Sequence, residues 1–303
     1  MRRLALGITL LALLCGPSVA ARASVAQRHV APAATFDSGI LRVERFGRAG
    51  ARPIVFIPAL FCGSWQWNAQ INALSTSYDL FVVTLPGFDG RPMVAGDDLM
   101  NRAARSIAAL IVARHLRRPI LLGHSLGGTL AVYFAERYPS DVSNVVTVEG
   151  GMPEGPTPAA RERAVARETA PFRGIPQGKL GAVLREQQLQ YTITGAADVA
   201  TVERYASRSQ PRAIVDWMRA AFLLDLTPDL TKIAAPFTVI VPFEPRIDPY
   251  VGFATADAKR AAYVRWAAHA RNSKVILIQP ARHFVMFDEP EEFERALEAA
   301  LER

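Results

Sequence analysis

Short, continuous runs of apolar residues alternate with longer segments of helical periodicity along most of this chain. A run of five or six apolar residues is typical of a strand that is buried on both faces of a parallel sheet. Parallel neighbours need a crossover connection, which is usually a helix. The runs cover residues 53–57, 80–84, 119–123, 144–148, 237–241 and 274–278.

The segments between these runs predict how the chain is divided. Strands that alternate with helices predict an α/β fold with a doubly wound, mostly parallel sheet. The alternation stops at residues 151–232, where a turn-rich stretch opens a series of helical patterns. We therefore predict a core of residues 24–150 and 233–303, with 151–232 as a helical cap over the sheet edge where ligands bind. The predicted core helices are 98–116, 126–137, 255–270 and 290–301, and residues 40–46 alternate like a half-buried strand.

The first residues have the layout of a secretory signal peptide. A basic start is followed by an apolar run at 4–14 with six leucines, and small-x-small cleavage patterns end at Ala20 and Ala23. A membrane span needs about 20 apolar residues, which this run does not reach. The sequence predicts a signal peptide over residues 1–23 and an exported protein, periplasmic or secreted, without a stable membrane anchor.

Charge and cysteine content narrow the class of protein. The formal charge is +7, and residues 1–20 contain two arginines and no acidic residue, so export lowers the charge to +5. The same cleavage removes Cys15 and leaves Cys62 alone, so we expect stability from core burial rather than from a disulfide. The basic residues form no clustered stripe, and we expect no nucleic-acid partner. The oligomeric state stays open.

The sequence Gly-His-Ser-Leu-Gly-Gly at 123–128 fits the pattern G-x-S-x-G, and it lies between a buried run and a helical segment. This context predicts that Ser125 lies at a sharp strand-to-helix turn, with its hydroxyl held at the carboxyl end of the strand. The flanking glycines leave room for the helix to approach the sheet. The helix N-terminus favours developing negative charge. We interpret Ser125 as a nucleophile.

A serine hydroxyl is a poor nucleophile without a base. His283 follows the last apolar run and therefore lies in a loop at the carboxyl end of a strand. We predict that His283 is the general base. The chain has five histidines, and the others fall in the N-terminal extension, near helix ends or beside the nucleophile: His29, His115, His269 and His124.

Together these features resemble the α/β-hydrolase family. The resemblance rests on the order of the strands, the motif at 123–128 and the segment 281–290 around His283, and it extends from about residue 40 onward. It implies the chain order nucleophile, acid, histidine. It also implies a serine esterase that uses an acyl-enzyme intermediate, with no metal and no organic cofactor.

Three carboxylates satisfy that order. Glu149 ends the run at 144–148, whereas Glu244 and Asp248 follow the run that ends at 241. Most of the family takes an Asp from the later position, in a Gly-x-x-Asp turn that this sequence lacks. Some members, notably certain haloalkane dehalogenases, take a Glu from the earlier position. We predict Glu149 as the acid and keep Glu244 and Asp248 as alternatives.

An oxyanion hole needs two backbone N–H groups. The resemblance implies that Leu126, which follows the nucleophile, supplies one of them. Leu60 matches the second donor by position, since relatives commonly have His-Gly-x where this chain has Pro-Ala-Leu at 58–60. Cys62, in the same loop, is interpreted as a small packed residue.

The sequence as a whole predicts an exported serine hydrolase that acts on a small-molecule ester. A serine nucleophile argues against the chemistry of dehalogenases and epoxide hydrolases. The same residues serve thioesters, lactones, amides or carbon–carbon bonds, so these remain alternatives. A non-catalytic binding protein with the same fold is a further alternative.

Overall fold

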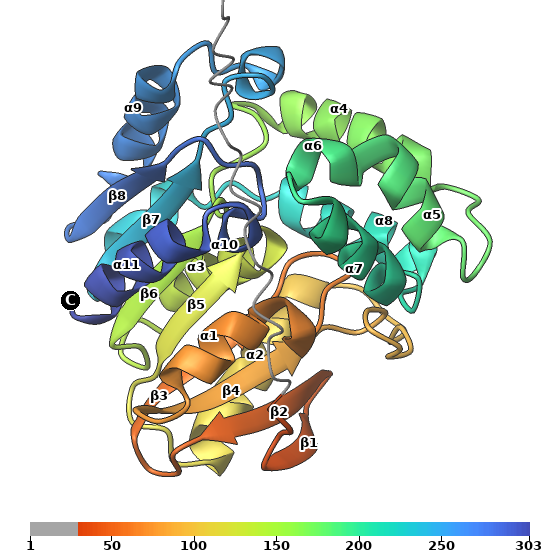
Figure 1. Ribbon diagram of the computed structural model, residues 1–303. Helices are drawn as coiled ribbons and strands as arrows, with labels where there is room; N and C mark the ends of the chain where they lie inside the picture. The colour runs from red at the N-terminus through yellow and green to blue at the C-terminus, as the bar shows by residue number, and fades with distance from the viewer. Residues whose placement is uncertain (1–29) are drawn as a thin grey trace, which may run out of the picture.

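An eight-stranded sheet forms the centre of the molecule in the computed structural model, which describes residues 30–303 (Figure 1). The predicted signal peptide lies outside the described residues. The strand order is β1-β2-β4-β3-β5-β6-β7-β8, antiparallel at β1, β2 and β4 and parallel from β4 onward. The predicted doubly wound, mostly parallel sheet is confirmed. The strands are β1 Ala34–Ser38, β2 Leu41–Gly47, β3 Arg52–Ile57, β4 Tyr78–Thr84, β5 Ile120–His124, β6 Asn144–Val148, β7 Phe237–Pro242 and β8 Ser273–Ile278.

The apolar runs form the interior of this sheet. Every residue of β5, β6 and β7 is buried, and β3 and β4 each have only one residue that is not. Strand β8 differs from the prediction of a strand buried on both faces, because most of its residues are only partly buried. It is the edge strand, so one side has no neighbouring strand.

Helices cover both faces of the sheet. In Figure 1, α1 and α11 lie in front of the sheet and α3 lies behind it. Helix α2 ends at Ala113, earlier than predicted, because the chain enters the left-handed region at His115 with φ 52°. The prediction did not include β1 and α1; β1 is mostly exposed and lacks an apolar run. The core helices are α1 Asn68–Leu74, α2 Leu99–Ala113, α3 Leu126–Arg137, α9 Ala256–Ala267, α10 Val285–Asp288 and α11 Pro290–Leu301, with short 3-10 helices η1 Ser64–Trp67 and η5 Asp248–Val251.

The segment between β6 and β7 is helical and lies beside the sheet, at the right of Figure 1. It joins the core partly through Trp217, whose indole N–H donates to the Pro86 carbonyl over 2.9 Å. Its helices are α4 Pro158–Thr169, α5 Leu180–Leu184, α6 Gln190–Thr192, α7 Ala196–Ala206 and α8 Pro211–Phe222, with the 3-10 helices η2 Ala170–Phe172 and η4 Thr227–Lys232 and the π-helix η3 Arg185–Leu189. We call residues 151–232 the cap.

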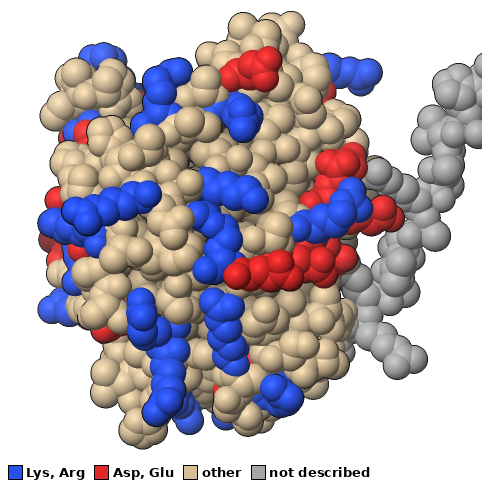
Figure 2. All heavy atoms as spheres, turned by 90° about the vertical axis from the view of Figure 1, so that its left-hand side faces the viewer, with Lys and Arg blue, Asp and Glu red and all other residues tan. Residues whose placement is uncertain are grey.

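Basic side chains are spread over the side of the molecule that carries α9 and β8. Figure 2 shows them scattered over this face, with uncharged surface and some acidic side chains between them. Exposed members on and around these two elements are Arg260, Arg265, Arg271 and Lys274. Within residues 30–303, no helix is both long enough and apolar enough to span a membrane.

The connection from β5 to α3 depends on two close backbone approaches. A Cβ atom on Gly123 would lie 2.1 Å from the Gly127 carbonyl oxygen, and one on Gly127 would lie 2.1 Å from the Ile57 carbonyl oxygen. Real Cβ atoms do not approach other atoms so closely, and backbone atoms have little room to move. The two glycines therefore let α3 begin directly against β3 and β5.

The close approach at Gly127 can be tested with Gly127→Ala. Alanine is favoured over glycine inside a helix by about 1 kcal/mol. The overlap with the Ile57 carbonyl should reverse this sign and lower the free energy of unfolding by about 3 kcal/mol or more. Urea unfolding measures the difference. Gly50→Ala is the control, since Gly50 has φ 79° and no atom near its Cβ position; it should lose only about 1–2 kcal/mol. A stabilised Gly127→Ala would contradict the steric argument.

Candidate active site

Ser125 occupies the turn between β5 and α3 in a strained conformation. Its φ is 54° and its ψ is −117°, a combination that residues with a side chain rarely adopt. The turn is held by the Ser125 N–H, which donates to the Val148 carbonyl over 2.9 Å, and by the Thr129 N–H, which donates to the Ser125 carbonyl over 3.0 Å. The side chain is partly exposed at the carboxyl end of the parallel strands.

His283 and Glu149 form a hydrogen-bonded pair beside this turn. The His283 Nδ1 lies 2.7 Å from the Glu149 Oε2, although the two residues are far apart in the sequence. The His283 ring lies 4.6 Å, centroid to centroid, from the ring of His124, which precedes Ser125 directly. A carboxylate accepts only, so it orients the imidazole with a proton on Nδ1 and leaves Nε2 as the proton acceptor.

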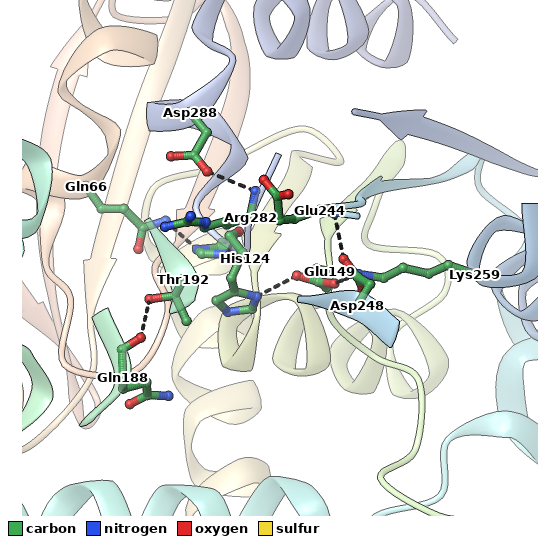
Figure 3. Close-up of polar contacts among 11 residues, drawn as sticks. Gln66, His124, Glu149, Gln188, Thr192, Glu244, Asp248, Lys259, Arg282 and Asp288 are labelled. Atoms are coloured by element: carbon green, nitrogen blue, oxygen red, sulfur yellow. Dashed lines mark hydrogen bonds and ion pairs between the residues drawn. The ribbon is translucent and has the colours of Figure 1, made fainter. Parts of the chain in front are cut away.

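The three candidate acids, Glu149, Glu244 and Asp248, have different partners in the structure. Glu149 is the one whose carboxylate contacts His283. Asp248 is buried and accepts a hydrogen bond from the Glu244 backbone N–H over 2.7 Å. Glu244 turns toward its own loop, where its Oε1 accepts from the Arg246 N–H over 3.1 Å. Figure 3 shows Glu149 and Asp248 close together, with the Glu244 side chain directed away from both.

Lys259, which the sequence reasoning missed, joins two of these carboxylates. Its ammonium lies 2.5 Å from Glu149 Oε1 and 2.6 Å from Asp248 Oδ1 (Figure 3). Burial by itself raises the pKa of Glu149, but Lys259 and the hydrogen bond from His283 outweigh it and lower that pKa from 4.5 to about 2. Burial lowers the pKa of Lys259, and the two carboxylates more than offset this, so its pKa is raised. Glu149 is therefore ionised at neutral pH.

The two expected oxyanion donors lie at the same end of the sheet, Leu60 in the loop after β3 and Leu126 at the start of α3. The Ala59 N–H is already used, because it donates to the Gln66 Oε1 over 2.9 Å. Among the described residues no backbone partner is found for the Leu60 N–H, which follows directly. Leu126 is the first residue of α3, where helix geometry leaves the N–H groups without an intrahelical partner. Within residues 30–303 neither N–H has a hydrogen-bond partner, so both can donate to a bound oxygen.

Buried hydrogen bonds of Gln66 and His124 connect this loop to the loop that carries His283. The sequence did not predict this connection. Gln66 Nε2 lies 3.0 Å from His124 Nδ1, and His124 Nε2 lies 3.0 Å from the His283 carbonyl oxygen. The carbonyl only accepts, so His124 carries its proton on Nε2 and accepts from Gln66. Complete burial lowers the pKa of His124 well below its usual value, as does its neighbour His283. His124 therefore acts as a neutral structural link.

Cys62 is fully enclosed in the loop after β3. Burial raises the pKa of its thiol well above the usual value, with a smaller contribution from Asp89. The thiol stays protonated at neutral pH and is therefore a weak nucleophile. The described part of the chain also contains no cluster of three or more His, Cys, Asp or Glu side chains that could hold a metal ion.

The cap contacts the histidine loop through a set of hydrogen bonds. Arg282, next to His283, donates to the carbonyls of Gln190 and Ile193 over 2.7 and 2.8 Å. Asp288 accepts from the N–H and the hydroxyl of Thr194 over 2.7 and 3.0 Å. The end of α6 is therefore tied to both sides of the loop that carries His283, and cap position and histidine position are coupled.

A cavity of about 470 Å³ lies within the cap between α4 and α8. Its lining includes Phe172, Val215 and Arg219, but not Ser125, His283 or Glu149. We place the candidate active site at these last three residues, because a strained serine and a hydrogen-bonded histidine–carboxylate pair are specific chemical features. The cavity in the cap lacks these groups, so we do not place the active site there.

The fold and the site define a class of α/β protein in which a strained strand-to-helix serine lies beside a histidine–carboxylate pair. A model of the alpha/beta hydrolase family matches residues 54–296, which is most of the chain. This protein belongs to the α/β-hydrolase family.

Two curated relatives show the range of activities around this chain. The 1-acylglycerol-3-phosphate O-acyltransferase ABHD5 of Rattus norvegicus is 28% identical over 275 residues, which cover 80% of this chain and 74% of that protein. The pimeloyl-[acyl-carrier protein] methyl ester esterase of Vibrio atlanticus is 30% identical over 129 residues, which cover 42% of this chain and 45% of that protein.

Solved structures resemble this one over almost their whole length. A bromoperoxidase from Bacillus anthracis superposes with a TM-score of 0.74 at 18% identity, covering 89% of this chain and 100% of that chain. An enol-lactonase from Burkholderia xenovorans superposes with a TM-score of 0.72 at 16% identity, covering 87% and 96%. At these identities the likeness concerns the fold alone.

The low pKa of Glu149 gives a test in the pH dependence of stability. A carboxylate whose pKa is about 2 when folded, against about 4.3 in the unfolded chain, stabilises the fold fully above about pH 5. That contribution, of about 3 kcal/mol, is lost as the pH falls from 5 to 2. We expect urea unfolding between pH 7 and pH 3 to show a flatter decline for Glu149→Gln than for the wild type.

Glu244→Gln is the matched control for this measurement. It removes a carboxylate from the same edge of the sheet, but one that contacts neither His283 nor Lys259 in the hydrogen bonds and ion pairs of residues 30–303. Its stability profile should run parallel to that of the wild type. If Glu149→Gln also runs parallel, the ionised Glu149 contributes nothing to the folded state and the electrostatic description of the site is wrong.

Proposed function

We propose that this protein is a serine hydrolase that cleaves carboxylic esters, with Ser125 as nucleophile, His283 as general base and Glu149 as the acid that orients the histidine. The observation that carries the proposal is the hydrogen bond between His283 and Glu149 beside the strained turn at Ser125. Geometry of this kind serves nucleophilic acyl transfer, in which a base removes the serine proton and a third group orients the base.

The proposed reaction has two halves. The Ser125 Oγ attacks the ester carbonyl carbon while its proton passes to His283 Nε2. The tetrahedral intermediate collapses, the carbon–oxygen bond to the alcohol breaks, and His283 returns the proton to the departing alcohol. Water then attacks the acyl-enzyme with His283 as base, and release of the acid regenerates the Ser125 hydroxyl.

The oxyanion donors in this proposal are the backbone N–H groups of Leu60 and Leu126. Gln66 supports the first of them, because its side chain holds the neighbouring Ala59 N–H and so fixes the loop without using the Leu60 donor. A fixed donor lowers the barrier more than a mobile one, since no reorganisation is needed as charge develops on the oxygen.

A second candidate differs only in the acceptor. The relative from Rattus norvegicus that aligns with 80% of this chain is named as an acyltransferase. In that case the acyl group passes from Ser125 to a hydroxyl of a second substrate instead of to water. The first half of the reaction and its residues are the same, so the acceptor must be settled by product analysis.

The location of the protein is also part of the proposal. The basic, apolar and small-residue segments of positions 1–23 support export to the periplasm or the medium. The proposed partner is a small-molecule ester; the proposal involves no nucleic acid, metal or organic cofactor.

A panel of activated esters of increasing acyl length tests the enzyme activity. We expect burst kinetics with the wild type and covalent labelling of Ser125 by an organophosphate. Ser125→Ala should lower kcat by roughly 10⁴-fold or more and abolish labelling. Adding 1-acylglycerol-3-phosphate and analysing the products separates hydrolysis from acyl transfer. Folded protein that labels at no serine and turns over no acyl donor would rule out both candidates.

The identity of the acid is tested by comparing Glu149→Gln with Glu244→Gln. Glu149→Gln removes the charge that stabilises the imidazolium and should lower kcat by roughly 10²- to 10⁴-fold at neutral pH. Glu244→Gln should stay within about threefold of the wild type. Steady-state kinetics on one activated ester measures both. Near-normal turnover by Glu149→Gln would remove it from the proposed mechanism.

A further inference from the structure

Lys259 on α9 is a buried cation between two carboxylates, of which Asp248 is buried and Glu149 is largely buried. Its side chain is 5% exposed, that of Asp248 is 7% exposed and that of Glu149 is 16% exposed. Isolated charges are costly to bury, and such a group persists where close partners compensate it. The Lys259 ammonium meets this condition by contacting Glu149 and Asp248 within 2.6 Å (Figure 3).

Each carboxylate in this cluster divides its two oxygens between two partners. Glu149 directs Oε1 to Lys259 and Oε2 to His283. Asp248 directs Oδ1 to Lys259 and Oδ2 to the Glu244 N–H. The chain His283–Glu149–Lys259–Asp248 is therefore continuous from the imidazole to a backbone anchor, and rotation of the Glu149 carboxylate would break two contacts at once.

The backbone of Glu149 reinforces this orientation. Its φ is 42°, in the left-handed region that a Glu seldom occupies, and its N–H donates to the Ile240 carbonyl over 2.9 Å. Contacts at both ends of the residue hold a conformation that is costly by itself. Lys259 supplies the side-chain end of that restraint.

The charges of the cluster balance in only one state of the histidine. With His283 neutral, two carboxylates and one ammonium leave one net negative charge. When His283 accepts a proton, the cluster becomes neutral. An arrangement that is balanced with the imidazolium favours the protonated histidine, which exists in the proposed reaction only while charge develops on the substrate.

We propose that Lys259 is a positioning residue, which holds the Glu149 carboxylate toward His283 and, with Asp248 as its second partner, balances the charge around the protonated histidine. This inference rests on the proposed function. It also explains why one carboxylate of the cluster, Glu149, follows β6 and the other, Asp248, follows β7. Asp248 neutralises the lysine, and the charge of Glu149 is left for His283.

Other titratable groups also face this cluster. His124 lies against His283 from β5, and Tyr263 faces Glu149 from α9. Glu154, in the segment after β6, interacts electrostatically with both His283 and Glu149. Although Glu154 is exposed, desolvation by the surrounding protein, together with Glu168, raises the pKa of its carboxyl to about 7. The test must therefore include a background without this carboxylate.

The experiment compares Lys259→Met, Asp248→Asn and the double variant, each with and without Glu154→Gln. Lys259→Met adds a net negative charge, so the midpoint of the acidic limb of kcat/KM should move to higher pH by about one unit. Asp248→Asn adds a net positive charge and should move it to lower pH by a similar amount. The double variant restores the net charge and should return the midpoint to the wild-type position.

Further readouts separate positioning from folding. Lys259→Met should lower kcat by about 10- to 100-fold with KM within about threefold, because a misdirected Glu149 affects the proton transfer more than binding. Lys259→Arg, which keeps the charge, should recover part of kcat and the wild-type midpoint. Arg260→Met is the matched control, since it removes one positive charge from the adjacent, exposed position of α9; it should leave kcat and the midpoint unchanged.

Different results would contradict the positioning role of Lys259 and the proposed hydrolase activity. The NMR titration of the His283 ring, assigned with His283→Gln, gives the same midpoints without any substrate. If the wild type hydrolyses esters but Lys259→Met and Asp248→Asn move the midpoint in the same direction, or not at all, the inference is wrong. If the wild type turns over no acyl donor, the proposed function fails, and the NMR midpoints alone decide whether Lys259 and Asp248 set the charge around His283.

Discussion

The backbone contact between α3 and the strands beside it is the constraint on which the site depends. Glycines at 123 and 127 allow the helix to begin within van der Waals distance of β3 and β5. A single residue, Ser125, connects β5 to α3, and it has a strained φ of 54°. The surrounding hydrogen bonds offset this strain. In this conformation the hydroxyl lies at the edge of the sheet where the loops after β3, β6 and β8 begin.

Electrostatics determines what the remaining polar groups do. Burial alone would disfavour the ionised form of Glu149, but Lys259 and His283 reverse this and keep the carboxylate charged. For His124 the balance is the opposite: burial and the neighbouring His283 lower its pKa more than Glu149 raises it, so the ring stays neutral. Two buried groups in contact with the same histidine thus have opposite charge states, so Glu149 is suited to stabilise an imidazolium and His124 to link two loops.

Much of the fold was predictable from the sequence, because strands buried on both faces leave a pattern that is local. The runs that became β3 to β7 are continuous and apolar, and the turn at Ser125 has its glycines nearby in the chain. Strand β1 and helix α1 were missed because neither has such a run. Gln66 and Lys259 were missed for another reason: a glutamine in a loop and a lysine on a helix are ordinary surface residues in sequence, and only long-range contacts make them part of the site.

The sequence by itself determined the parallel strands of the sheet, the strand-to-helix turn at Ser125 and the position of His283 after the last strand, since each depends on residues within a few positions of one another. It left three carboxylates for one role. Only the tertiary structure separated them, by placing Glu149 against His283 and Asp248 against Lys259. The physical reason is that a carboxylate's partner is set by distances between separate elements, which for Glu149 and His283 lie 134 residues apart in the chain, and by which cation is buried there to compensate its charge.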